Sequence, residues 1–378
     1  MQWDLIIAGG GPVGLATAIA ARRRGLSAVV IERAPSLPEK ACGEGLMPGA
    51  VAALAVLGIS LDEGFELRGI RFVDEGDVAS ARFPERQGRA LSRARLMQAL
   101  DARARSVGVE IMSGHTLRDF RYDRRVLSAE ISSAGGGIRS VAGRLLVAAD
   151  GLRSPIRRRL GYELPPRGTP RYGMQRHYQR APWSDWVEVY WHAQAEAYVT
   201  PLGSDGVGVA VLSHGRPRSH EEVLALFPAL STQLAHATAL GRVRGAGPLE
   251  QRVKSVLGPG VALVGDAAGY LDALSGEGLA LGFRSALALV ERFATGELWL
   301  YPRDHSRLCR AYYAMTLLML ELARRPRLRR SAVRFLSTRP ELFSDLLGIA
   351  ADSIVTPSSK LGSALRWLAA EPDPPGGG

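Results

Sequence analysis

The sequence predicts an α/β fold in which a nucleotide-binding domain with a parallel sheet is interleaved with an antiparallel-sheet domain and followed by a helical region. Three observations support this prediction. The first 32 residues show the pattern strand, glycine-rich turn, helix, strand, a β-α-β unit that implies a parallel sheet. Residues 170–215 alternate apolar and polar side chains, as antiparallel hairpins do. After residue 303 the pattern is helical.

The composition fits a folded chain with a large core. The chain has 378 residues, of which 46% are hydrophobic. Asp4 precedes the first apolar run and glycines end it, which is not the pattern of a secretory signal. No window offers the roughly 18 uninterrupted apolar residues of a membrane span. Only Cys42 and Cys309 are cysteines, so we expect neither a disulfide framework nor a metal site, and a cytoplasmic location.

The individual elements follow from periodicity and turn residues. Apolar runs predict strands at 3–8, 28–31, 143–151 and 261–266, and helical spacing predicts helices at 13–24, 92–108 and 276–294. We therefore assign residues 1–65, 91–168 and 256–300 to a discontinuous nucleotide-binding domain, and residues 66–90 and 169–255 to a substrate-binding antiparallel sheet. Residues 301–370 form a C-terminal helical region, and residues 371–378 are assigned to a disordered tail.

The glycine-rich turn has the spacing of a dinucleotide-binding site. Gly9 permits the tight turn, Gly11 lets the backbone approach a pyrophosphate, and Gly14 lets helix pack on strand. The phosphates would lie at the positive N-terminus of the helix. Glu32 ends the next strand, where its carboxylate can accept hydrogen bonds from a ribose and would repel a 2′-phosphate. The turn therefore predicts a Rossmann-like site for NAD or FAD.

Two further motifs follow in order, and with the first they carry a family resemblance. The segments GGGPVG…ER, ADGLRSPIRR and VGDAAG resemble the flavoprotein family that contains p-hydroxybenzoate hydroxylase-type monooxygenases and geranylgeranyl reductases, over roughly residues 3–295. The resemblance implies bound FAD, with Asp266 accepting hydrogen bonds from the ribityl chain and Arg93 reaching the phosphates; Arg95, or a solvated helix start, is the alternative. The implied cofactor-binding residues at these motifs are Gly9, Gly11, Pro12, Gly14, Glu32, Arg33, Arg93, Asp150, Gly151, Gly265 and Asp266.

Two segments resemble the reductase branch of this family. Gly276-Glu277-Gly278 starts a helix whose free N–H groups would face the flavin ring and stabilise negative charge on it, where the hydroxylases usually carry a proline. Cys42-Gly43 lies in a loop that in the reductases runs beside the flavin. Cys42 is the one candidate catalytic residue; its alternative role is that of a small buried side chain that packs against the loop.

The inserted sheet is expected to carry an apolar substrate. Reductases that act on prenyl chains usually show a Tyr-x-Trp-x-Phe-Pro motif here, whereas this chain keeps only Tyr198 and Pro201. Tyr178 and Tyr190 are further candidate wall residues, with plain core packing as the alternative. The histidines on this sheet have no metal-ligand spacing.

Two enzymatic hypotheses from these observations remain open. The first is a flavin monooxygenase that uses NADH or NADPH as a transient electron donor and oxygenates an apolar or aromatic molecule; the lost prenyl-motif residues favour it. The second is a reductase of carbon–carbon double bonds in a prenyl lipid or polyketide, favoured by Cys42-Gly43 and Gly276-Glu277-Gly278. A flavin halogenase and a non-enzymatic nucleotide-binding protein are weaker alternatives.

The positive charge of the chain is partly local. The net charge is +11, and residues 301–340 hold ten arginines against Asp304 and Glu321. Such a region could contact a lipid surface, so we expect a possible peripheral membrane contact through 303–340; solvated helix faces are the alternative. No aromatic platform interleaves the arginines, so nucleic acid is not expected as a partner. The sequence leaves the oligomeric state open.

Overall fold

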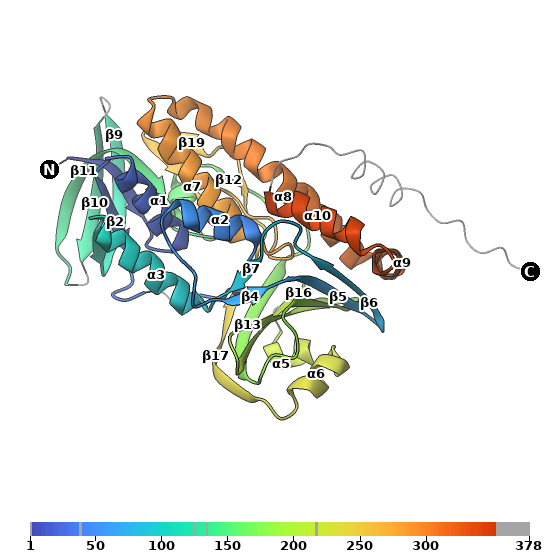
Figure 1. Ribbon diagram of the computed structural model, residues 1–378. Helices are drawn as coiled ribbons and strands as arrows, with labels where there is room; N and C mark the ends of the chain where they lie inside the picture. The colour runs from blue at the N-terminus through green and yellow to red at the C-terminus, as the bar shows by residue number, and fades with distance from the viewer. Residues whose placement is uncertain (1, 38–39, 124–125, 134, 216–217, 353–378) are drawn as a thin grey trace, which may run out of the picture.

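The predicted fold class is confirmed by the computed structural model, which describes residues 2–352 except 38–39, 124–125, 134 and 216–217 (Figure 1). Its N-terminal β-α-β unit consists of β1 (Gln2–Ala8), α1 (Pro12–Arg23) and β2 (Ala28–Glu32). Both β2 and β11 (Ile138–Ala148) pair with β1 in parallel. The nucleotide-binding half therefore rests on a parallel sheet, as the apolar runs predict.

This first sheet has eight strands, six in one continuous path and two in a hairpin that lies off this path. Its path runs β19-β20-β11-β1-β2-β8, with β8 at Glu110–Ser113, β19 at Leu257–Gly258 and β20 at Val261–Leu263. An antiparallel hairpin of β9 (His115–Asp123) and β10 (Val126–Ser133) extends β11. The sequence-based assignment did not include this hairpin.

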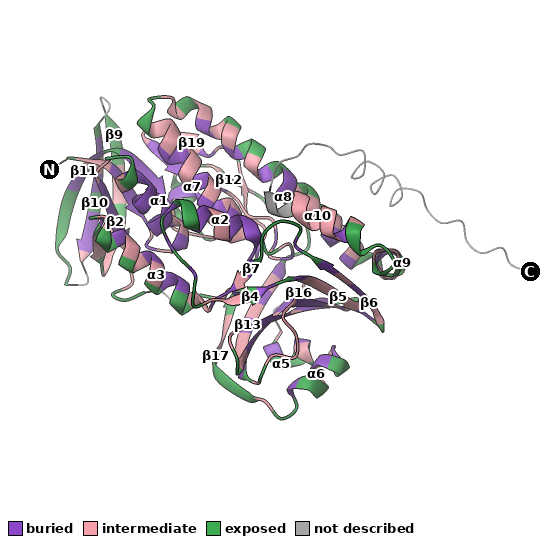
Figure 2. Cartoon of the chain, viewed as in Figure 1, coloured by how far each residue is buried: buried purple, intermediate pink, exposed green. Residues whose placement is uncertain are grey.

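Helices cover the parallel sheet and form one apolar core with it. They are α1, α2 (Pro48–Val56), α3 (Arg93–Ser106) and α7 (Gly278–Ala294), and α1 packs against both α3 and α7. Figure 2 shows α1 of this layer as mostly buried, whereas β9 at one edge of the molecule has intermediate and exposed residues and no buried ones. Two short helices complete the domain: α4 (Pro155–Arg159) and the 3-10 helix η1 (Gly265–Ala268).

The second sheet has seven strands in the order β17-β13-β16-β15-β14-β5-β6. The bounds are β5 (Gly69–Asp74), β6 (Asp77–Arg82), β13 (Arg171–Gln179), β14 (Val187–Trp191), β15 (Ala195–Pro201), β16 (Gly206–His214) and β17 (Thr238–Ala246). All neighbours are antiparallel except β14 and β5. Helices α5 (His220–Leu224) and α6 (Pro228–Leu234) cover one of its faces, below the sheet in Figure 1.

Two small sheets and the C-terminal helices connect the halves. The small sheets are β3 (Gly45–Leu46), β7 (Gly88–Ala90) and β4 (Phe65–Leu67), and the pair β12 (Glu163–Leu164) and β18 (Arg252–Val253). After η2 (Leu298–Leu300), helix α8 (Tyr301–Arg324) packs on α7. Helices α9 (Pro326–Ser337) and α10 (Pro340–Asp352) pack against β6. The predicted segment 353–370 and the tail 371–378 lie outside the described residues.

None of the helices in the described part of the chain has the length and apolar character needed to cross a membrane.

Candidate functional site: cofactor-binding motifs beside the antiparallel sheet

The three glycines of the first turn have different structural roles. Gly9 has φ 109°, and a Cβ there would overlap the carbonyl of Ala149. A Cβ on Gly14 would overlap the carbonyl of Gly9. Gly11, in contrast, has nothing within 4 Å of its Cβ position, and no side chain caps α1 at this residue. The turn is therefore closed on the sheet side and open at the helix N-terminus, where an anion can approach the free N–H groups.

Glu32 is fixed at the end of β2 by the backbone. Its Oε2 accepts the N–H of Gly10 at 2.6 Å, and its Oε1 accepts the N–H of Ala34 at 2.8 Å. Each carboxylate oxygen has a second lone pair, so the side chain can still accept hydrogen bonds from a ribose. Arg33 beside it is exposed.

Arg157 joins the two aspartate motifs, a role that sequence analysis did not assign. This fully buried guanidinium donates to the carbonyls of Asp266 and Ala267, both at 3.3 Å, and to that of Leu152 at 2.8 Å. It therefore holds the turn after β11 against η1. Arg157 lies in the segment ADGLRSPIRR, which sequence analysis identified. The spacing of residues along the chain does not, however, reveal that Arg157 contacts Asp266, 109 residues away.

The two aspartates carry carboxylate oxygens that are available to a ligand. Asp150 accepts the N–H of Ile156 at 3.2 Å through Oδ2, and its buried Oδ1 has no partner among the described residues. Asp266 makes no side-chain hydrogen bond within the described part of the chain. Burial raises the pKa of both carboxyls, and nearby Arg157 opposes the shift in both. Such groups match the hydroxyls of a sugar or ribityl chain.

Arg93, rather than Arg95, lies at the site. Burial raises the pKa of Cys42 and the pKa of Asp266, and the positive charge of Arg93 opposes both shifts. The buried Nε of Arg93 has no partner among the described residues. Arg95 points to solvent and pairs with Glu63 at 3.0 Å. Lys40, which sequence analysis missed, also lowers the pKa of Asp266 and lies 3.6 Å from the Cβ position of Gly151.

Cys42 lies in a loop that the antiparallel sheet holds in place. Its Sγ accepts the N–H of Glu44 at 3.4 Å, and Thr200 of β15 donates to the carbonyl of Gly43 at 2.9 Å. Because burial raises the pKa of Cys42 above its ordinary value, the side chain is a protonated thiol at neutral pH.

Glu44 is the second site residue that sequence analysis missed. It is buried, and its φ of 62° is in the left-handed region that disfavours side chains. Its carboxylate accepts His177 Nε2 at 2.5 Å, Gln175 Nε2 at 3.2 Å and the N–H of Arg93 at 2.8 Å. Glu44 thus ties the Cys42 loop to β13 and to α3. The sequence feature that indicates a polar partner here is the pair Gln175 and His177, two polar residues on one face of a half-buried strand.

The N-terminus of α7 lies close to the segment that follows the Cys42 loop. Gly276 has φ 69° and its Cβ position is 3.8 Å from Met47, which follows the Cys42 loop. Glu277 is buried, and the helix begins at Gly278, which lies against Tyr270. No side chain caps this helix start within the described residues. Its N–H groups are therefore available to negative charge.

The four predicted substrate residues do not share one face of the sheet. Tyr198 lies on the face toward the cofactor domain, where its hydroxyl donates to the carbonyl of Leu274 at 3.0 Å. Tyr178 and Tyr190 lie on the opposite face, in the cluster with α5 and α6. Strand alternation places Pro201 on that opposite face too, because Val199 belongs to the same cluster.

The side of the sheet toward the cofactor domain has an apolar part, which lies beside the polar side chains of Gln175, His177 and Thr200. Half-buried side chains from the sheet, the loop before α7 and helix α8 gather there, namely Phe65, Phe72, Tyr198, Leu202, Tyr270, Leu271, Ala273 and Met315. This surface lies beside the Cys42 loop, since Met47 belongs to the same cluster. An apolar molecule fits such walls.

A family model described as "FAD binding domain" matches residues 2–297. The chain therefore belongs to the FAD-dependent oxidoreductases with this domain, as the three motifs indicate.

Curated relatives of similar length include reductases. A menaquinone reductase of Mycobacterium tuberculosis is 31% identical over 329 residues, 78% of each chain. Digeranylgeranylglycerophospholipid reductase 1 of Methanopyrus kandleri is 29% identical over 297 residues, 74% of this chain and 77% of the relative. Among solved structures, p-nitrophenol 4-monooxygenase of Pseudomonas putida shares the fold with a TM-score of 0.77 at 18% identity, covering 92% of this chain and 98% of the other.

The residues around the three motifs fit FAD. Gly11 leaves its backbone open to a pyrophosphate, Glu32 can bind a ribose, and the buried Oδ1 of Asp150, without a partner among the described residues, can accept a hydroxyl group. Arg93 and Lys40 supply positive charge beside Asp266.

Proposed function

We propose that the protein reduces a carbon–carbon double bond in an apolar, isoprenoid-like substrate. The observation that carries this proposal is the half-buried Cys42 thiol: its sulfur accepts the N–H of Glu44, and Thr200 of the antiparallel sheet binds the carbonyl of the next residue, Gly43. The relatives at about 30% identity that are named as reductases support it.

Bound FAD, reduced by NADH or NADPH, supplies a hydride to a double bond or, with dioxygen, an oxygen atom to a substrate. Double-bond reduction also requires a proton on the second carbon. Cys42 is protonated at neutral pH, so it can donate that proton, and the positive charge of Arg93 stabilises the thiolate that remains. Solvent returns a proton to the thiolate after the product leaves.

The apolar face of the antiparallel sheet would orient the substrate and exclude water. Tyr198, Tyr270 and Phe72 contribute side chains to it, and the Tyr198 hydroxyl is occupied by the carbonyl of Leu274. Apolar walls of this kind suit a hydrocarbon chain or a ring without polar substituents.

A flavin monooxygenase is the second candidate, the one that the sequence alone favours. The specific observation is the missing tryptophan and phenylalanine around Tyr198, the residues expected in a prenyl pocket. Under this hypothesis the same apolar face holds an aromatic substrate, and Cys42 only packs.

The two candidates are separated by one comparison. The FAD-loaded protein is incubated with NADH or NADPH and with menaquinone, geranylgeranyl lipids or apolar aromatics, both without oxygen and under ¹⁸O₂. We expect a product heavier by two hydrogens, formed equally well without oxygen. A product that carries ¹⁸O and forms only in its presence would overturn the proposal in favour of the monooxygenase.

A further inference from the structure

Glu44 contacts both the thiol of Cys42 and the antiparallel sheet. Its N–H donates to the Sγ of Cys42 at 3.4 Å, and its carboxylate accepts Nε2 of His177 at 2.5 Å. Gln175, two residues earlier on β13, donates to the same carboxylate at 3.2 Å. One residue therefore connects the proposed proton donor to two polar side chains of the sheet.

The fold makes room for the Glu44 carboxylate on the sheet. Its Oε2 lies 3.3 Å from the Cβ position of Gly208, which is the register partner of His177 on β16. A side chain at residue 208 would crowd the carboxylate. The backbone of Glu44 has φ 62°, a conformation that disfavours side chains and persists only where other contacts offset its strain. The donors to the carboxylate are such contacts.

His177 is the more exposed member of its pair with Glu44. The side chain of His177 is 25% exposed, whereas that of Glu44 is 3% exposed. Because an ionised carboxylate can only accept hydrogen bonds, Nε2 of His177 is the donor, and this contact fixes the orientation of the ring. The hydrogen bond also offsets part of the negative charge of Glu44. The charge that Glu44 exerts on its surroundings therefore depends on His177.

The charged and titratable groups around Cys42 come from three elements. Burial is the largest cause that raises the pKa of Cys42; the charge of Arg93 on α3 opposes this shift, and the charge of Glu44 in the Cys42 loop adds to it. Tyr270, in the loop before α7, also interacts with Cys42. Burial raises the pKa of Tyr270 well above its ordinary value, so its hydroxyl is neutral at pH 7. Arg93 and Glu44 therefore act on the thiol with opposite signs.

We propose that His177 and Glu44 act together as positioning residues for the Cys42 thiol. Glu44 holds the sulfur through its N–H and keeps the thiol protonated through its negative charge, and His177 sets how much of that charge remains. Since the sulfur accepts the N–H of Glu44, the S–H bond points elsewhere and stays available to a substrate. The catalytic consequence rests on the proposed function, because Cys42 is the proton donor of that reaction.

The test titrates the Cys42 thiol in the FAD-loaded protein without substrate. Cys309→Ala removes the other cysteine, so the infrared S–H stretching band reports Cys42 alone, and its loss with rising pH measures deprotonation. In this background Glu44→Gln should lower the midpoint by about one pH unit, because a negative charge no longer disfavours the thiolate. His177→Leu should raise it by about half a pH unit, because the charge of Glu44 loses a donor.

The opposite signs distinguish this role from a merely structural one. A loosened loop would expose Cys42 to water in either variant and lower both midpoints, because burial is the largest cause of the raised pKa. In turnover, the pH above which kcat for double-bond reduction falls should move with each midpoint, downward in Glu44→Gln and upward in His177→Leu. If Glu44→Gln failed to bind FAD, the rise in His177→Leu would still decide the question.

Glu188→Gln is the matched control for Glu44→Gln. Glu188 is also buried, and its carboxylate also accepts three hydrogen bonds, from Arg71, Trp183 and Tyr190. Trp183 and Tyr190 belong to the opposite face of the sheet, with α5 and α6. This variant should leave the midpoint of Cys42 unchanged.

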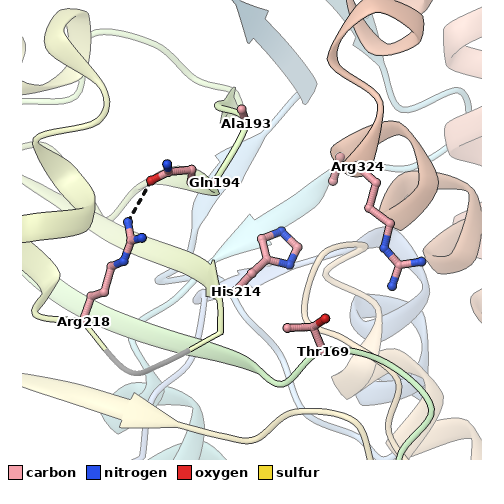
Figure 3. Close-up of a pocket in the computed structure, with 7 residues that line it drawn as sticks. Thr169, Ala193, Gln194, His214, Arg218 and Arg324 are labelled. Atoms are coloured by element: carbon pink, nitrogen blue, oxygen red, sulfur yellow. Dashed lines mark hydrogen bonds between the residues drawn. The ribbon is translucent and has the colours of Figure 1, made fainter.

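His214→Leu is the matched control for His177→Leu. His214 is the register partner of Arg171, at the other end of the β13–β16 ladder. Figure 3 shows it in a cavity that Arg218 and Arg324 also line. Burial and the charge of Arg171 lower its pKa to about 4, so the ring is neutral at pH 7. Its replacement should not move the midpoint of Cys42.

Two outcomes would overturn the proposal. One is a shift of the same sign in Glu44→Gln and His177→Leu, and the other is a pair of shifts no larger than those of the controls. Because the titration contains no substrate, it is decided independently of the product assay. Incorporation of ¹⁸O would reject double-bond reduction and leave the titration result intact, and the reverse also holds.

Discussion

The carboxylate of Glu44 connects the Cys42 loop to the antiparallel sheet. Three groups donate to its buried carboxylate, and its backbone has φ 62°. We expect Glu44→Ala to lower the free energy of unfolding by about 2–4 kcal/mol, because His177 and Gln175 lose a buried acceptor. Chemical denaturation of the FAD-loaded protein measures the change.

Glu75→Ala is the control for this experiment. Among the described residues, Glu75 is the other glutamate with positive φ, at 48°; it is exposed and forms an ion pair with Arg330. Its replacement should change stability by less than about 0.5 kcal/mol. Equal losses in the two variants would mean that the backbone conformation, and not the contacts of Glu44, sets the cost.

Replacing Cys42 and Cys309 one at a time distinguishes a chemical role of a cysteine from a structural one. If the Cys42 thiol donates the proton, Cys42→Ala should slow double-bond reduction by about 100-fold while FAD content is unchanged. Cys309 is buried in α8 beside His305, so Cys309→Ala should affect stability and leave turnover per folded enzyme unchanged. Stopped-flow rates with equal flavin loading give the comparison; an unchanged rate in Cys42→Ala would remove the residue from the mechanism.

At the residue scale, sequence analysis found the groups whose role is local. Gly14 and Glu32 contact Gly9 and Gly10 within one β-α-β unit, so spacing along the sequence is sufficient to predict that these residues meet, whereas Gly9 also lies against Ala149 of a distant segment. Glu44 and His177 lie 133 residues apart, and their meeting depends on how two sheets pack. No pattern along a single strand contains that information.

A buried ion pair connects α9 to the antiparallel sheet. Arg329 donates to both oxygens of Asp74, at 2.8 and 3.0 Å, and both side chains are almost completely buried. Arg329→Met should cost about 3–5 kcal/mol, because Asp74 is left as an unpaired buried charge. Thermal unfolding measures this loss. The exposed pair Arg334–Asp77 joins α9 to the neighbouring strand β6, and Arg334→Met should leave the Tm unchanged.

This pairing also bears on the basic C-terminal region. Arg329 faces the protein interior, and Arg325, Arg330 and Arg334 each have a carboxylate partner. A substantial part of the local arginine excess is therefore balanced within the fold. The peripheral membrane contact predicted for 303–340 stays a prediction.

Elements were easier to predict than the faces they present. The strand and helix of the β-α-β unit and helices α3 and α7 were found because their apolar spacing is regular. Strand alternation correctly separates the two faces of β13 and β15 but does not say which face meets the cofactor domain. Helices α5 and α6 pack against the face that carries Tyr178. Tyr198 therefore lies on the other face, toward the cofactor domain.

At the scale of the whole molecule, buried histidines oppose folding in acid. The pKa values of His192, His214, His220 and His305 are all lowered, with burial as the first cause in each. A lowered pKa means that the unfolded chain binds protons that the folded chain cannot, so stability is lost as the pH falls below about 6.5. Buried carboxyls such as Asp272 and Glu196 have raised pKa values and act in the opposite direction.

His305 allows the histidine contribution to be isolated. Burial lowers its pKa to about 4, and it lies beside Cys309 and Tyr301 in the core between α8 and the parallel sheet. Between pH 7 and pH 5 this one group should cost about 2 kcal/mol of folding stability. His305→Asn cannot take up the proton, so its Tm should fall less than that of the wild type over this range, even if it starts lower. If the Tm of both proteins fell by the same amount between pH 7 and pH 5, burial would not be lowering the pKa of His305 in the folded state.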